Sequence, residues 1–154
     1  MATIPAALHE YINTAFPTNV CLTGVVLDDG FAQISPRGSM QVFDGQTLAY
    51  WARGGGKSAE AITDGTKITV YYRNPELGGR GGGNGMLPAG GIARFYGAAE
   101  IHKEGDAYEQ VWNNMVQQER DNDADKGGYA VLIRLEKVLD LRGQDLPAEL
   151  APKS

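Results

Sequence analysis

Cysteine is almost absent from this sequence, and long apolar runs are missing. The single thiol, Cys21, excludes an internal disulfide framework and a zinc site built from paired cysteines. No apolar run approaches the ~20 residues of a membrane-spanning helix. The N-terminus carries Glu10 and lacks the basic start of a signal peptide. We therefore expect a cytoplasmic protein without a membrane partner.

Positive charge is also scarce. The chain has 14 Lys and Arg residues against 19 Asp and Glu residues, a formal net charge of −5. Nucleic-acid binding needs a basic face, so we expect no nucleic-acid partner. His9 and His102 have no carboxylate or cysteine at a ligand spacing, and we interpret both as surface or structural histidines.

Three aspartates, Asp121, Asp123 and Asp125, are spaced as in a calcium-binding loop. Such a loop needs a glycine at its sixth position and a closing glutamate. The sixth position is Lys126, and the glutamate is missing. We therefore interpret this segment as the solvated end of a helix.

The sequence pattern predicts one domain over residues 1–154, mainly β with peripheral helices. Closely spaced apolar runs and Asp-Gly turns indicate an antiparallel barrel of six strands. Helical periodicity predicts helices over residues 5–16 and 106–123, with a short helical turn over residues 58–62. The expected strands cover residues 20–27, 31–35 and onward, 47–52, 67–72, 92–102 and 129–141.

Glycine is abundant, with 21 residues, and many of them fall in two loops. Residues 74–91 form a long glycine-rich insertion, either a lid or an irregular loop. The second loop, "RGGGKS", begins at Arg53. Its glycine N–H groups, Lys57 and Ser58 could bind a phosphate, with Arg37 alongside. The alternative is a flexible loop with a solvated lysine, because Trp51 stands where a P-loop needs glycine. Residues 143–154 are expected to form a loose tail.

The segments "GFAQISPRG", "TLAYWARGGGKSAEAITDGTKITVYY" and "RFYGAAEI" resemble the pyridoxamine 5′-phosphate oxidase-like family of FMN-binding split barrels. The similarity runs from about Val20 to His102 and more loosely to Leu141. The resemblance rests on the order and spacing of these three segments. The positions that match the family's cofactor-binding motifs are Ser35, Pro36, Arg37, Gly38, Tyr50, Trp51, Ala52, Lys57 and Ser58.

This resemblance implies a six-stranded split barrel that forms a homodimer, with an FMN site at the subunit interface. It implies an FMN-dependent oxidoreductase that acts on a small-molecule substrate and uses NADH or NADPH as a possible electron donor. The last strand lacks the Arg/His substrate cluster of the true oxidases, so we expect a substrate other than pyridoxamine phosphate. Flavin-, deazaflavin- or haem-binding without catalysis remains the alternative. Trp112 is expected in the core rather than at the partner's site.

Overall fold

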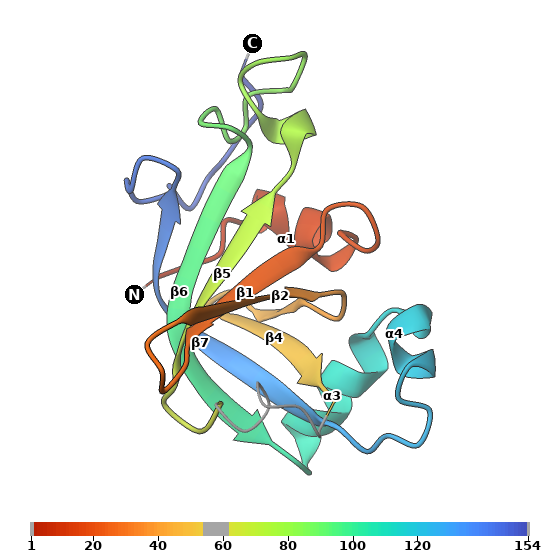
Figure 1. The fold of residues 1–154 in the computed structure, drawn as a ribbon. Helices are drawn as coiled ribbons and strands as arrows, with labels where there is room; N and C mark the ends of the chain where they lie inside the picture. Colours follow the sequence, from red (N-terminus) through yellow and green to blue (C-terminus); the bar gives the residue numbers. More distant parts are fainter. Residues whose placement is uncertain (1, 54–61, 154) are drawn as a thin grey trace.

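The computed structural model describes residues 2–53 and 62–153, and a curled antiparallel sheet forms the body of this part of the chain (Figure 1). Its seven strands lie in the order β2-β1-β5-β6-β7-β4-β3, and each neighbouring pair is antiparallel. The strands are β1 (Cys21–Val26), β2 (Ala32–Arg37), β3 (Gln41–Asp44), β4 (Thr47–Ala52), β5 (Lys67–Arg73), β6 (Ile92–His102) and β7 (Tyr129–Asp140).

The split-barrel class expected from the sequence fits this sheet, but the predicted number of six strands is wrong. The sequence pattern suggested one returning strand from residue 31 toward the second Asp-Gly turn. The chain instead turns at residues 38–40, where Met40 N–H donates to Arg37 O. This turn carries the chain from β2, at one edge of the sheet, to β3 at the other edge. The two segments are therefore separate strands.

The larger core fills the concave side of the sheet beneath helix α1 (Ala6–Asn13). Leu8 and Ile12 of α1 are buried against residues such as Tyr72 and Phe95. The helix is shorter than the predicted span of 5–16, since Thr14 already leaves helical geometry. No helix in the described ranges has the length and apolar character needed to cross a bilayer.

A second core lies on the opposite side of β4 and β7, under helix α3 (Asp106–Asn114). The predicted helix over residues 106–123 is broken, because Met115 and Val116 adopt extended backbone conformations. A short helix, α4 (Gln117–Asp121), then follows. Figure 1 shows α3 and α4 beside the end of β4. The break between the two helices therefore keeps α4 close to that strand.

The glycine-rich segment between β5 and β6 forms many backbone hydrogen bonds. It starts with a turn of 3-10 helix, η1 (Pro75–Leu77), and Leu77 and Leu87 are buried. The C-terminal segment lies nearby: Leu146 N–H donates to Val138 O, and Lys153 N–H donates to Asn84 O. These contacts position both segments at the end of the molecule opposite α3 and α4 (Figure 1).

Candidate functional site

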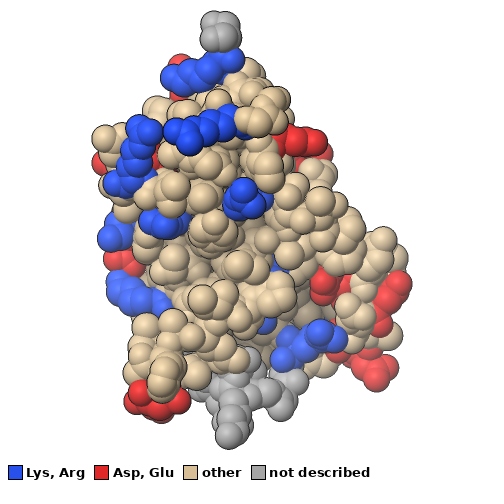
Figure 2. All heavy atoms as spheres, turned by 45° about the horizontal axis from the view of Figure 1, so that its top comes forward, with Lys and Arg blue, Asp and Glu red and all other residues tan. Residues whose placement is uncertain are grey.

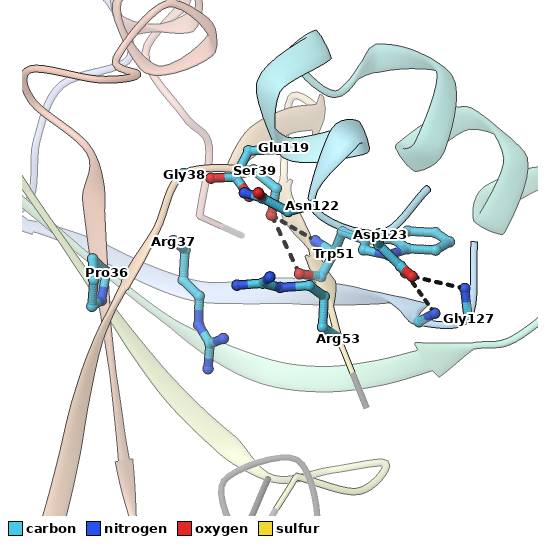
Figure 3. A pocket seen from close by; sticks show the side chains of 11 residues that line it. Pro36, Arg37, Gly38, Ser39, Trp51, Arg53, Glu119, Asn122, Asp123 and Gly127 are labelled. Atoms are coloured by element: carbon cyan, nitrogen blue, oxygen red, sulfur yellow. Dashed lines mark hydrogen bonds between the residues drawn. The ribbon is translucent and has the colours of Figure 1, made fainter. Parts of the chain in front are cut away.

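A cavity of about 700 Å³ lies between the turn after β2, the end of β4 and the segment from α4 to β7. Figure 3 shows the side chains around it. Its lining residues are Pro36, Arg37, Gly38, Ser39, Trp51, Arg53, Glu119, Asn122, Asp123, Gly127 and Gly128. Its size falls in the range of small-molecule sites, which is about 300–1,000 Å³.

Arg37, the last residue of β2, is held by two contacts. Its Nε donates to Thr23 Oγ1 at 3.0 Å, and its guanidinium carbon lies 4.6 Å from the centre of the Tyr50 ring. Such a cation–aromatic contact stabilises the charge while leaving other guanidinium N–H groups available. Arg37 is therefore a positioned cation at the edge of the cavity.

The turn after β2 is fixed to β4 through the buried Ser39 side chain. Ser39 Oγ accepts a hydrogen bond from Trp51 N–H at 2.9 Å and lies 3.4 Å from Trp51 O (Figure 3). The backbone N–H groups of Gly38 and Ser39 donate to no other described residue. Gly38 and Ser39 both line the cavity.

The Trp51 side chain points away from the larger core and forms part of the cavity wall. Its ring packs against Tyr108 and Trp112, with centroid distances of 5.0 and 4.9 Å. Trp112 is partly buried in this cluster. Trp51 Nε1 donates to Asp123 Oδ2 at 2.8 Å. Trp51 therefore links β4 to the segment that follows α4.

Asp123 also binds the backbone on its far side. Its carboxylate accepts hydrogen bonds from Gly127 N–H at 3.0 Å and Gly128 N–H at 2.7 Å. Burial raises the pKa of Asp123, but these bonds, the Trp51 bond and the charge of Arg53 together bring the pKa below its ordinary value of 3.8. A lowered pKa means that the ionised form stabilises the fold, and that this contribution is lost as pH falls below about 4.

Arg53 brings a second cation to the cavity from the end of β4. Figure 3 shows its exposed side chain extending from β4 toward Arg37. Neither arginine forms an ion pair with a carboxylate in the described ranges, although Glu119 and Asp123 also line the cavity. The cavity therefore has two guanidinium groups that no described carboxylate pairs with.

Behind Arg37 lies a buried polar region. The Tyr50 hydroxyl is buried and has no hydrogen-bond partner among the described residues, and the same holds for Gln33 Oε1. Burial raises the pKa of Tyr50 to about 12, while the Arg37 charge lowers it and Tyr129 raises it. Tyr50 is therefore neutral at physiological pH and can donate a hydrogen bond.

The structure brings together most of the predicted cofactor-binding residues that it describes. Pro36, Arg37, Gly38 and Trp51 line the cavity. Ser35 faces a small neighbouring hollow with Arg37, and the buried Ala52 ends β4. Tyr50 lies under Arg37. Lys57 and Ser58, the short helical turn and the three glycines of the predicted phosphate loop lie outside the described residues.

Sequence analysis missed the residues that α4 and the following segment contribute. The interpretation of residues 121–125 as a solvated helix end is wrong for Asp123, which holds Trp51 and two glycine N–H groups. Its partner Trp51 is 72 positions away, and no local pattern reports such a contact. Ser39 is a second missed residue. Serine is common in turns, so a serine just after a strand does not by itself indicate a functional residue.

Neither a family model nor a curated protein sequence matches this chain. Several solved structures are similar to it. HupZ from Group A Streptococcus is 23% identical, covers 94% of this chain and 99% of its own, and has a TM-score of 0.67. A protein described as a candidate pyridoxamine 5′-phosphate oxidase, from Lactobacillus delbrueckii, is 23% identical over 90% of this chain and 99% of its own, with a TM-score of 0.58.

An FMN-binding protein from Syntrophomonas wolfei is more distant, at 12% identity and a TM-score of 0.51, over 88% of this chain and 86% of its own. At these identities the comparisons show the fold alone. The chain has the split-barrel fold of pyridoxamine 5′-phosphate oxidase-like and FMN-binding proteins, which is the resemblance predicted from the sequence.

Proposed function

From this fold and this cavity, we propose that the protein binds FMN and acts as an oxidoreductase. The bound flavin would exchange a hydride or electrons with a nicotinamide cofactor or a small organic substrate. The observation that carries the proposal is that Arg37 and Arg53 line one cavity of about 700 Å³, and that neither pairs with a carboxylate of residues 2–53 or 62–153.

The residues around the cavity fit a phosphorylated flavin. Guanidinium groups bind phosphate oxygens through paired, charge-assisted hydrogen bonds, so Arg37 and Arg53 suit the FMN phosphate. The N–H groups of Gly38 and Ser39, which donate to no other described residue, would suit acceptor atoms on the polar edge of the ring system. The unpartnered Tyr50 hydroxyl supplies a further buried donor behind Arg37.

The chain's own contribution to the chemistry would be orientation and electrostatics. The Ser39–Trp51 hydrogen bonds hold the donor-bearing turn against β4, and Asp123 holds the opposite wall. Neither role requires a side chain to transfer a proton. This agrees with a flavin reaction, in which the cofactor carries the electrons.

The test is the absorption spectrum of the purified protein before and after incubation with FMN and desalting. We expect flavin absorption bands to remain with the protein, and FMN fluorescence to change on binding. Reduction of the retained flavin by NADH or NADPH in the absence of oxygen would support the oxidoreductase part. Retained flavin that neither donor nor a panel of small substrates reduces would support non-catalytic binding. A haem Soret band, or a spectrum without bound flavin, would contradict the proposal.

We also propose that the protein is a homodimer, with the second copy covering the outer face of β1 and β2. Val26 is 70% exposed and Ile34 67%, and Phe31 at the adjoining turn is 74% exposed. Register places Gly24 opposite Ile34, so this part of the face is flat as well as apolar. A two-fold dimer buries the same apolar patch on both copies, which removes it from water.

The cavity supports this arrangement, because Pro36 is exposed, lies two residues from Ile34 on the same side of β2, and also lines the cavity. A partner that covers Ile34 would therefore reach the rim of the site. We expect Ile34→Lys to shift the mass measured by light scattering from dimer to monomer. Thr18→Lys, in an exposed loop, is the matched control. A parent protein that is already monomeric at high concentration would contradict the proposal.

A further inference from the structure

A second cavity, of about 370 Å³, is lined by segments at the end of the molecule opposite α3 and α4 (Figure 1). It is formed by the end of β5, the glycine-rich loop over residues 74–91 and the turn after β7. Arg73, Arg80 and Arg142 line it, together with the apolar surfaces of Pro75, Pro88 and Leu141. The two cavities share no lining residue.

The walls of this second cavity are held by backbone contacts. Asn74 N–H donates to Gly91 O, and Gly79 N–H donates to Pro88 O, so the two halves of the loop are joined. Gly91 has a φ of +70°, and a Cβ there would lie 2.1 Å from Asn74 O, so only glycine fits. The loop is therefore closed on itself by contacts that fix its shape.

Within the described part of the chain, these three arginines lack a paired counter-charge. None of them forms an ion pair with a carboxylate in residues 2–53 or 62–153. Two acidic residues lie close to these arginines in the sequence. Glu76 is exposed, and the Asp140 carboxylate accepts hydrogen bonds from the backbone N–H groups of Arg142 and Gln144. Figure 2 shows blue basic side chains spread over this end of the molecule.

This concentration of positive charge is unexpected in a chain with a net charge of −5. Three arginines around one cavity bring positive charges to the same surface, and a bound anion would reduce the repulsion between those charges. Arg80 and Ala89 both line the cavity, and their backbone N–H groups donate to no other described residue. Charged and neutral donors thus meet beside an apolar wall.

We propose that this cavity binds a diphosphate-bearing small molecule of the nucleotide class. A diphosphate offers enough oxygens for three arginines, whereas one carboxylate can satisfy only a single bidentate contact. The 41% exposed Leu141 and the two prolines form an apolar surface for a planar base. This site is separate from the proposed flavin site and does not depend on it.

The test is a titration of the full chain with ADP at low salt, followed by calorimetry and by amide NMR shifts. We expect binding that weakens as salt rises, with shifts in residues 78–90 and 141–143. Adenosine, which lacks the diphosphate and so every contact with the arginines, should bind at least about 100-fold more weakly. Arg80→Gln with Arg142→Gln should weaken ADP binding by about 100-fold, since each guanidinium contributes about tenfold.

The control is a double variant, Lys67→Gln with Arg120→Gln, which removes the same charge from surfaces outside both cavities. It should bind ADP within about twofold of the parent protein. Any remaining difference would reflect the lower overall positive charge, and salt would screen it. The proposal is overturned if ADP does not bind at millimolar concentration. It is also overturned if both double variants lose affinity equally, or if the shifts cluster at Arg37 and Arg53 instead.

Discussion

Replacing Arg37 and Arg53 together by glutamine is expected to weaken FMN binding by about 100-fold or more. A charge-assisted hydrogen bond contributes about 1.5 kcal/mol or more, roughly a tenfold change in the dissociation constant for each arginine. Both side chains reach the same cavity, and neither has a carboxylate partner among the described residues. The measurement is the dissociation constant from quenching of FMN fluorescence.

The two arginines differ in their structural roles, and the single variants separate binding from folding. Arg37 contacts Thr23 and Tyr50, so its loss is expected to lower thermal stability as well. Arg53 is exposed and forms no ion pair with any described residue, so Arg53→Gln should weaken FMN binding with little change in stability. Lys67→Gln is the charge control. Unchanged FMN affinity in Arg53→Gln would remove Arg53 from the proposed site.

Gly128→Ala is expected to lower the free energy of unfolding by about 2–3 kcal/mol, a typical result of overpacking. A Cβ at this position would lie 2.3 Å from Ala52 O and 2.6 Å from Trp51 Nε1. The backbone or the indole must therefore move, and the cavity wall moves with it. Gly127→Ala is the matched control, because its Cβ meets only Asp123 Oδ1, at an ordinary 3.7 Å. Denaturant unfolding of the two variants measures the difference.

The same region should also show a pH effect. The lowered pKa of Asp123 means that its ionised form stabilises the fold at neutral pH and ceases to do so as pH falls below 3.8. Asp123→Asn is therefore expected to be less stable than the parent at pH 7, and to lose less stability between pH 5 and 3. Equal slopes for the two proteins in that range would show that the Asp123 carboxylate does not stabilise the fold.

Several features could be predicted because they depend on residues close together in sequence. Closely spaced apolar runs predicted most strands, and the Asp-Gly turns placed the hairpins. The split-barrel resemblance pointed to residues 35–38 and 50–52, and these lie in or beside the larger cavity. The break after β2 was missed, because the local pattern continues through residues 38–40 and only the sheet order separates β2 from β3.

The sequence by itself determined the mainly β class and the apolar face of α1. Each follows from periodicity or from one short motif, which the chain satisfies locally. Only the tertiary structure decided that Asp123 would hold Trp51, and that three arginines from separate segments would share one cavity. Those contacts join residues distant in the chain, and their geometry depends on how the sheet curls and where α3 ends.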